Sequence, residues 1–376
     1  MPGKDNGSRL NDGELRPQGR RFIKLWIIGI ILPFLLVTGF MVGVINENKQ
    51  SPVNRHMEWM SPNLTETGLT ADDFNLPANS TPTKVVTGIY IDRINDLSLT
   101  DSKWTVDFYI WFKWNGSDVD PGKSFQVIDG EIGVNQKELI EEYTNGTQHY
   151  EIYYVTATIT KFFDILRFPV DNHILTIGIE DKKALRQDLI YVPDNSSNVS
   201  PSVEVQGYNV SKLAIIEKPH IYPSSFGDPR EQNTTTSYSQ LRAGIDIYRP
   251  DLGFYFRIFI GLFVAVAASL VALFINPTEA EPRFGLGAGA LFVAIANTIV
   301  TSSLIPKTGI MTLADMVNDL GLFLILITLM ESTVSLYLYS KSEKELSRRL
   351  DRVSFIALLL IYVIATTAIS VSGWQF

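Results

Sequence analysis

Hydrophobic residues along the chain are concentrated in five long blocks that polar segments separate. A helix of about 20 apolar residues crosses the hydrocarbon layer of a bilayer, which is about 30 Å thick. Each block is long enough to do this, so the pattern predicts five membrane-spanning helices. They cover approximately residues 22–45, 252–275, 284–305, 313–339 and 353–371.

The polar segment between the first two blocks has a different period. In residues 104–114 apolar side chains alternate with polar ones, which is typical of a half-buried antiparallel strand. Short stretches separated by Asn, Gly and Pro clusters favour an immunoglobulin-like β-sandwich. Strands are predicted at residues 85–94, 104–114, 151–160, 173–180, 189–192, 211–216 and 241–247.

The distribution of basic residues predicts which side of the membrane each segment occupies. Arg16, Arg20, Arg21 and Lys24 lie at the start of the first block, and Lys341, Lys344, Arg348, Arg349 and Arg352 link the last two blocks. Loops rich in Lys and Arg stay in the cytoplasm. The polar domain is therefore expected outside the cell membrane, as the large domain of a multi-pass protein.

The resulting fold class is a membrane protein of β + α type: an extracellular β-sandwich, then a four-helix transmembrane bundle, with an additional N-terminal hydrophobic segment. The expected domains are a disordered cytoplasmic tail (1–21), a signal anchor or signal peptide (22–45), a linker (46–84), the extracellular domain (85–250) and the channel domain (251–376). The hydrophobic core of segment 22–45 is longer than that of a typical signal peptide, and no Ala-x-Ala site follows it, which favours a retained anchor.

Sequons of the form Asn-x-Ser/Thr gather in the polar domain. Either they are glycosylated or they reflect a surface rich in Ser, Thr and Asn, and both interpretations place them in solvent. They begin at Asn63, Asn79, Asn115, Asn145, Asn195, Asn198, Asn209 and Asn233.

Composition excludes several classes of protein. The chain has no cysteine, so it can form neither a disulfide nor a cysteine-ligated metal site. Its four histidines are scattered, and no nucleophile–base set is evident, so we expect no cofactor and no enzymatic activity. A formal net charge of −8 argues against a nucleic-acid partner.

Several motifs occur in a specific order. Residues 87–98 read Thr-Gly-Ile-Tyr-Ile-Asp-Arg-Ile-Asn-Asp-Leu-Ser, residues 104–114 read Trp-Thr-Val-Asp-Phe-Tyr-Ile-Trp-Phe-Lys-Trp, and residues 164–171 read Asp-Ile-Leu-Arg-Phe-Pro-Val-Asp. Arg249-Pro250 precedes a membrane helix, and Pro306-Lys-Thr308 lies between two others. This series resembles the pentameric ligand-gated ion channels (the Cys-loop receptor superfamily), in which the third motif is the signature loop. Lys161 and Leu175 stand where eukaryotic members have cysteines, so the resemblance is to the prokaryotic type that lacks the disulfide.

The resemblance covers residue 85 to the C-terminus and implies a function. It implies a homopentameric cation-selective channel gated by an extracellular small-molecule ligand or by protons. Its partners would be itself, membrane lipid, permeating monovalent cations and that agonist. The alternative is a non-conducting membrane receptor that signals through a partner.

By the same resemblance, the helix predicted at 284–305 lines the pore. Its lining face would be Gly285, Gly289, Phe292, Ala296, Ile299 and Ser303, with Glu281 one turn before, at the cytoplasmic mouth. A ring of carboxylates there favours cations, and Phe292 is either a hydrophobic gate or a packing residue. The glycines either widen the pore or form a close helix–helix contact, in which case this face does not meet water. Glu331, inside the 313–339 span, has either a gating or proton-sensing role or a structural one.

The family also implies a coupling contact and an agonist site. The coupling residues would be Asp96, Arg167, Asp171, Arg249, Pro306 and Lys307. The alternative is that the charged residues among them form ordinary solvated salt bridges with no role in coupling. The candidate agonist site, between neighbouring outer domains, comprises Tyr109, Tyr143, Tyr222, Phe226 and Tyr238, for which packing is the alternative role. Residues 180–183, Glu-Asp-Lys-Lys, lack the aromatic side chain that relatives often place there. This weakens the prediction of an aromatic box that binds an amine, and the charged groups there leave room for an acidic or zwitterionic agonist, or for protons sensed by carboxylates and by His149 or His173.

Overall fold

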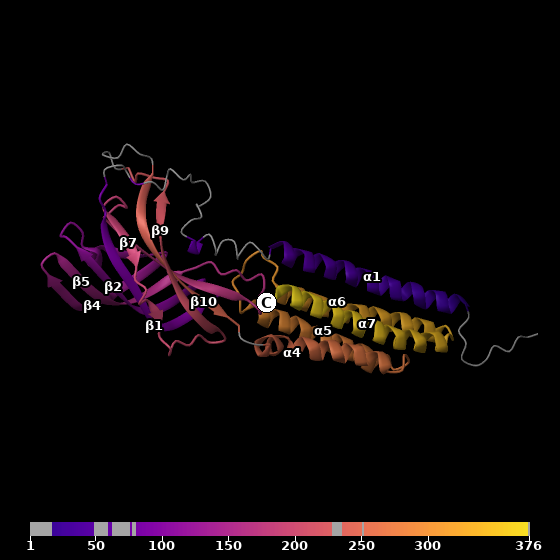
Figure 1. Cartoon of the computed structure of the whole chain (residues 1–376). Coiled ribbons are helices and arrows are strands. Elements are labelled where there is room, and N and C mark those ends of the chain that lie inside the picture. Colours follow the sequence, from indigo (N-terminus) through magenta and orange to yellow (C-terminus); the bar gives the residue numbers. More distant parts are fainter. Residues whose placement is uncertain are drawn as a thin grey trace, which may run out of the picture.

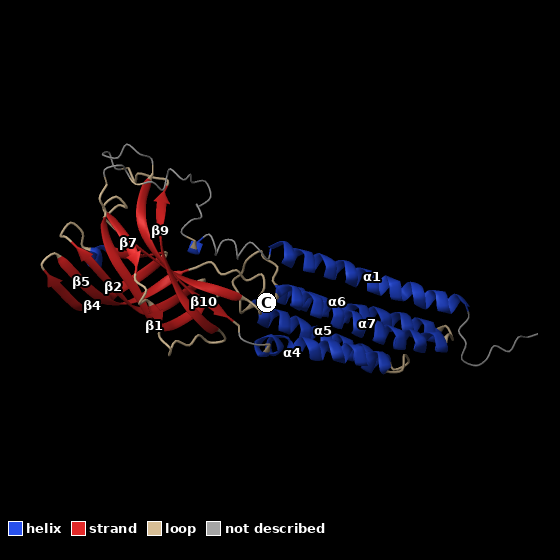
Figure 2. Ribbon diagram, viewed as in Figure 1, coloured by secondary structure: helices blue, strands red, loops and turns tan. Residues whose placement is uncertain are grey.

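The computed structural model of the protein describes residues 17–48, 59–61, 76, 80–227, 235–249 and 252–374. It has a β-rich domain at one end and long parallel or antiparallel helices at the other (Figures 1 and 2). The expected division into a β-sheet domain and apolar helices is thereby confirmed. Residues 1–16 of the predicted tail, most of the predicted linker, Pro250 and the sequon asparagines Asn63, Asn79 and Asn233 lie outside the described residues.

The β domain contains two sheets. One has the strand order β4-β5-β2-β1-β7 with β8 beside β1, and the other has the order β3-β6-β10-β9. All neighbours are antiparallel except β7 and β8, which run parallel to β1. The strands are β1 (Thr83–Ser98), β2 (Lys103–Asn115), β3 (Phe125–Ile128), β4 (Gly130–Asn145), β5 (Gln148–Thr160), β6 (Asn172–Asp181), β7 (Leu189–Pro193), β8 (Asn198–Val199), β9 (Asn209–Tyr222) and β10 (Thr236–Tyr248).

One hydrophobic core joins the two sheets. The alternating apolar residues of β2, from Trp104 to Phe112, are buried as their period of two predicts. Leu175 and Ile177 of β6 and Ile245 of β10 belong to the same core from the other sheet. All seven predicted strands are present, whereas β3, β4 and β8 were not predicted. β4 escaped prediction because it is an edge strand rich in Glu and Lys, with both faces largely exposed.

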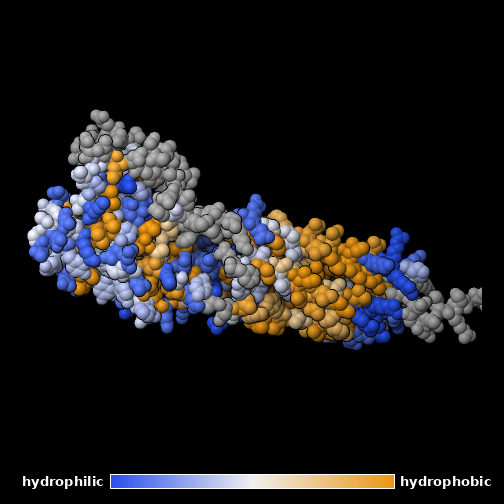
Figure 3. All heavy atoms as spheres, in the orientation of Figure 1, coloured by the Kyte–Doolittle hydropathy of each residue, from blue (hydrophilic) through white to orange (hydrophobic). Residues whose placement is uncertain are grey.

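Within the described residues, five helices are long and apolar enough to cross a membrane. They are α1 (Pro17–Asn48), α4 (Gly253–Val271, prolonged by the 3₁₀ turn Ala272–Phe274), α5 (Ala280–Ser302), α6 (Leu313–Ser340) and α7 (Lys344–Gly373). The short helix α3 (Pro121–Ser124) lies in the β domain. The surface of the five long helices forms an apolar band between the β domain and a hydrophilic far end (Figure 3). The basic link 341–352 is mostly helical rather than a loop, because α7 begins in it and is supported there by the Glu345–Arg349 ion pair at 2.9 Å.

Helix α1 packs beside α7 as a fifth member of the helical region, which the sequence did not predict. Its buried residues, Ile23, Ile30, Phe34, Thr38, Met41 and Ile45, recur at helical spacing and form one stripe. Trp26 Nε1 donates a hydrogen bond to Ser354 Oγ of α7 at 3.2 Å, and the ring of Phe34 lies 5.0 Å from that of Phe323 in α6.

Candidate functional site

The loop of residues 164–171 lies between β5 and β6, and it contacts the start of helix α6. The backbone N–H of Leu313 donates to the carbonyl oxygen of Leu166 at 2.8 Å, and that of Ala314 donates to the carbonyl oxygen of Phe168 at 3.0 Å. The first N–H groups of a helix have no partner within the helix, so this loop supplies acceptors for the first turn of α6. The capping box between Thr312 and Asp315 completes that end of the helix.

A buried ion pair lies at the same junction. Asp171, which is 1% exposed, accepts from Arg249 Nε at 2.8 Å and from the Tyr208 hydroxyl at 2.8 Å. His173 Nε2 lies 2.5 Å from Asp171 Oδ2, the oxygen that also accepts from Tyr208. Arg249 in turn stacks over the ring of Phe254, in the first turn of α4, at 3.9 Å. The pair thus joins the end of the 164–171 loop, the end of β10 and the start of α4.

The charges around Asp171 fix its ionisation state. Burial by itself would raise the pKa of this carboxyl, but the hydrogen bond and charge of His173, together with those of Arg249, outweigh burial and hold the pKa below its usual range. Asp171 is therefore an anion at neutral pH, and Arg249 has a permanent buried counterion.

The other predicted coupling residues lie apart from this pair. Arg167 points toward Asn172, to which it donates a hydrogen bond, and it lines a cavity rather than the Asp171 cluster. Asp96 and Lys307 are exposed and Pro306 is half-buried. Within the described part of the chain, neither Asp96 nor Lys307 forms an ion pair with Asp171 or Arg249. The expected cluster of six is thus reduced to one ion pair, and the sequence did not assign Tyr208 to it.

The predicted pore-lining residues all lie on the exposed side of α5. Phe292 is 75% and Ile299 66% exposed, although both are large apolar side chains. The residues concerned are Glu281, Gly285, Gly289, Phe292, Ala296, Ile299 and Ser303. The opposite side of α5, with Ala290, Ala294 and Thr301, packs against α4 and α6.

The two glycines on this exposed face make no close contact within the chain. A Cβ added at Gly285 or Gly289 would meet nothing within 4 Å, whereas one at Gly287 would lie 2.3 Å from Leu329 Cδ2. Among these three glycines of α5, the close helix contact within the chain is therefore at Gly287. Gly285 and Gly289 are left for water, lipid or another copy of the chain.

A charged triad is buried among the helices. Arg283 Nη2 donates to Asp351 Oδ1 at 2.6 Å and to Glu331 Oε2 at 3.2 Å. The three residues come from α5, α7 and α6, and Arg283 is 1% exposed, so its side chain faces away from the exposed face of α5. Glu331 is therefore a buried carboxyl with a hydrogen bond to Arg283, and its gating or proton-sensing role stays a prediction. Asp351 was not singled out because it lies outside the apolar block of its helix.

Of the predicted agonist-site residues, Tyr222, Phe226 and Tyr238 form a first group. Tyr222 of β9 lies 5.4 Å from Phe226 and 5.7 Å from Tyr238 of β10, between ring centroids. Its hydroxyl donates to Glu180 Oε2 at 3.0 Å, and burial together with Glu180 raises its pKa. Tyr109 and Tyr143 belong to the other sheet.

The other two predicted residues lie on separate strands of the other sheet, Tyr109 on β2 and Tyr143 on β4. Tyr109 packs against Tyr154 at 4.8 Å and Tyr90 at 6.4 Å. Tyr143 is exposed near the β4–β5 turn. The Glu180 carboxylate, which Tyr222, His220 and Gln240 all contact, is the residue that organises the first group. It belongs to the segment 180–183, in which the sequence indicated only an absence of aromatic side chains.

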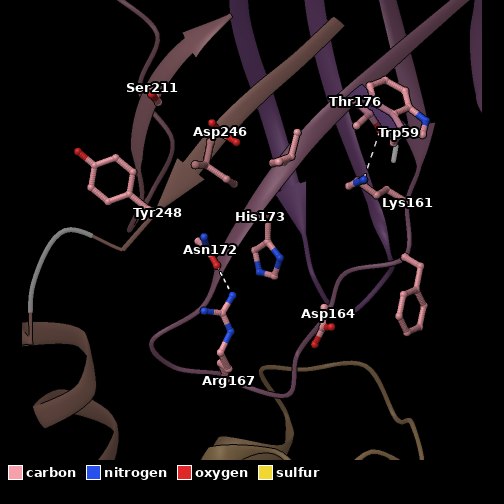
Figure 4. A pocket seen from close by; sticks show the side chains of 13 residues that line it. Trp59, Lys161, Asp164, Arg167, Asn172, His173, Thr176, Ser211, Asp246 and Tyr248 are labelled. Carbon is pink, nitrogen blue, oxygen red and sulfur yellow. Dashed lines mark hydrogen bonds between the residues drawn. The ribbon is translucent and has the colours of Figure 1, made fainter. Parts of the chain in front are cut away.

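A cavity of about 650 Å³ opens on the sheet of β6, β10 and β9, next to the 164–171 loop. Arg167, Lys161, Asp164 and Asp246 bring charges of both signs to its wall (Figure 4). Among the described residues no group of His, Asp and Glu side chains could hold a metal ion. Comparison with models of known protein families gives no match, and comparison with curated protein sequences gives none either.

Proposed function

We propose that five copies of this chain form a cation-selective channel of the pentameric ligand-gated type in the cell membrane. The β domain would be an extracellular immunoglobulin-like sandwich, and α4 to α7 would be the four-helix bundle of each subunit. The agonist would be an extracellular small molecule or protons. The observation that carries the proposal is the long exposed face of α5, apolar at Phe292 and Ile299 and acidic at Glu281.

Phe292 is exposed on a helix whose main contacts are with α4 and α6, so this large apolar side chain needs a partner or a function. If five copies of α5 surround an axis, this face meets water. Five Phe292 rings then form a constriction that stops ions by dewetting, and five Glu281 carboxylates at the mouth attract cations and repel anions. Arg283, with the opposite charge, is buried on the other side of the helix and would not offset that ring.

The junction supports a route from the outer domain to the pore. Movement of the β domain would reach α6 through the two backbone hydrogen bonds of the 164–171 loop, and α4 through Arg249. Both helices pack against α5. A change in the β domain would therefore bias the helices around the pore, as gating requires.

The charges at the helix ends support the proposed orientation. Arg20, Arg21 and Lys24 of α1 and Lys341 and Lys344 near the start of α7 lie at the end of the helices that is far from the β domain (Figures 1 and 3). The rule that basic flanks remain inside would put the β domain outside the cell.

The proposal predicts ion selectivity that depends on Glu281. Purified protein in planar bilayers under a tenfold cation gradient should give reversal potentials near the cation equilibrium potential, because the carboxylate ring excludes anions. Glu281→Gln should move the reversal potential toward zero. Glu343→Gln, an exposed glutamate at the same end of the helices but before α7, should leave it unchanged. No current across pH 4–8 and a metabolite screen, or equal effects of the two variants, would contradict the proposal.

The alternative, a non-conducting membrane receptor, is favoured by one observation. Gly285 and Gly289 lie four residues apart on an open face, and small residues at this spacing allow two membrane helices to approach closely. In that case α5 would bind another helix instead of water. The mass of the detergent-extracted protein distinguishes the two, because a channel requires about five times the chain mass of 42.1 kDa, and a dimer or monomer would favour the receptor.

A further inference from the structure

The cavity beside the 164–171 loop lies on the outer face of the β6–β10–β9 sheet. Asn172, His173, Ile174 and Thr176 of β6 line it, whereas Leu175 is buried in the core between the sheets. Asp246 and Tyr248 of β10 line it from the neighbouring strand. Its volume of about 650 Å³ lies within the range of about 300–1,000 Å³ that is usual for small-molecule sites. It is separate from the aromatic cluster of Tyr222, which lies at the other end of β9.

Positive charge enters the cavity from two elements. Arg167 rises from the loop, is only 6% exposed, and is held by its hydrogen bond to Asn172. Lys161, which precedes the loop, donates to Thr176 Oγ1 at 3.3 Å on the opposite side (Figure 4). A guanidinium fixed in this way presents a planar set of donors that matches a carboxylate. Desolvation lowers the pKa of Arg167, against the attraction of Asp164 and Asp171, so a bound anion would compensate for its burial.

Negative charge and an aromatic wall complete the cavity. Asp246 is exposed on β10 and lies across the cavity from Arg167 (Figure 4). Trp59 forms part of the wall and is positioned by Arg242, whose Nη1 donates to the Trp59 carbonyl oxygen at 3.1 Å and whose guanidinium lies 5.2 Å from the indole ring. Tyr248 supplies a second ring on the opposite side.

We propose that this cavity binds a small zwitterion with the chemistry of an α-amino acid that has an aromatic or bulky apolar side chain. The ligand carboxylate would pair with Arg167, its ammonium group with Asp246, and its apolar part with one of the two aromatic walls, that of Trp59. A ligand of a single charge satisfies only one side of the cavity, which is why a zwitterion fits best.

Binding here would act on the contact between the two domains. Arg167 is adjacent to Phe168, whose carbonyl oxygen accepts from Ala314 of α6, and Asn172 is adjacent to Asp171. A ligand that bridges Arg167 and Asp246 would hold the 164–171 loop against the sheet. The site would therefore modulate gating, and this part of the inference rests on the proposed function.

The test measures binding and current separately. Isothermal titration of the detergent-purified full chain would use L-phenylalanine and two matched probes, 3-phenylpropionate, which lacks the amine, and 2-phenylethylamine, which lacks the carboxylate. Because a charge-assisted hydrogen bond is lost with each deletion, both probes should bind at least about tenfold more weakly than phenylalanine. Arg167→Gln should weaken phenylalanine and phenylpropionate about tenfold but leave phenylethylamine unaffected. Asp246→Asn should abolish the preference for phenylalanine over phenylpropionate.

The control is Tyr143→Ser, at an exposed position of the other sheet, which should bind all three probes as the wild type does. Asp246 is exposed and Arg167 is buried, and unchanged thermal unfolding would confirm that both variants fold. Absence of binding heat for all probes, or unchanged affinities in both variants, would overturn the inference. A protein that binds but carries no current would refute only the proposed channel, and one that conducts without binding would refute only this site.

Discussion

Asp171 forms an ion pair with Arg249 at the contact between the β domain and the helices. It is nearly inaccessible to solvent, and it is the counterion of Arg249, which stacks on Phe254 at the start of α4. A buried charge whose partner is removed costs much more than an exposed one, about 3–5 kcal/mol against about 0–1 kcal/mol. Residues at this junction should therefore differ sharply in their effect on stability.

We expect Asp171→Asn to lower the midpoint of thermal unfolding of the detergent-purified protein by roughly 5–10 °C. The reason is that Arg249 stays buried without a negative partner. Asp96→Asn, which changes an exposed carboxylate of β1, should shift the midpoint by no more than about 2 °C. Equal shifts in the two variants would show that the Asp171–Arg249 pair contributes little.

The pH dependence of this effect follows from the lowered pKa of Asp171. A carboxyl whose pKa is depressed in the folded state stabilises it at every pH above its unfolded pKa, about 3.9, and loses this effect as the pH falls through the folded value. In a His173→Gln background, which removes the neighbouring imidazole, the difference in midpoint between Asp171 and Asp171→Asn should therefore be constant from pH 5 to pH 8. If that difference disappears within this interval, the carboxylate is not held as an anion in the way described.

Prediction from sequence at the residue scale succeeded only where a local motif identifies a position. Asp171 and Arg249 stand in such motifs, and the structure brings them together. Tyr208 and Asp351 come from separate elements with no pattern around them, so only the fold shows that they contact Asp171 and Arg283. The cavity lined by Trp59 was not predicted for the same reason, since the residues that line it come from separate segments of the chain.

At the scale of elements, the buried triad of Arg283, Glu331 and Asp351 joins three helices with one positive and two potentially negative groups. Arg283→Met should lower the unfolding midpoint more than Glu331→Gln does. The first change leaves two carboxyls buried without their cation, whereas the second keeps the Arg283–Asp351 contact at 2.6 Å and removes the surplus acid. Thermal unfolding of both variants would measure this, and a larger loss for Glu331→Gln would contradict the triad's arrangement.

Helix α5 has two distinct faces, and the chain has no cysteine, so single cysteines can probe them without a background. Phe292→Cys and Ala296→Cys should react with a charged, membrane-impermeant thiol reagent and block current, because in the proposed pore this face meets water. Ala290→Cys and Ala294→Cys, on the buried face, should react at least about tenfold more slowly, since each lies against α4 or α6. Reaction at the second pair alone would mean that the first faces lipid or protein.

The existence of an element was predictable where one face is apolar, but its ends were not: β9 extends to Tyr222 and β10 begins at Thr236, beyond the predicted 211–216 and 241–247. The strands with alternating residues and the five apolar blocks all correspond to observed elements. The β4 strand and the start of α7 were missed because their residues are charged and their stability comes from pairing with β5 and from contacts such as Glu345–Arg349. Tertiary pairing overrides a weak hydrophobic pattern at such places.

For the whole molecule, the position of α1 changes the expected architecture. A signal peptide would be removed, but α1 covers one side of α7, with Ile23 packed beside Leu346 near one end and Trp26 bonded to Ser354. We therefore expect α1 to remain in the mature protein. Intact-mass measurement of membrane-extracted chains should give a mass that includes residues 17–48.

The same contacts predict what the loss of α1 would do. A chain without residues 1–48 would expose the apolar strip of α7 and lose the Phe34–Phe323 contact, so its unfolding midpoint in detergent should fall. A chain without residues 1–16 keeps all the described contacts of α1 and is the matched control, with an expected midpoint equal to that of the full chain. If the longer truncation unfolds at the same temperature as the shorter one, α1 is only a leader that rests on a bundle complete without it. A fall confined to the longer truncation would make α1 a structural member of each subunit, and five such helices would then form the outer rim of the proposed pentamer.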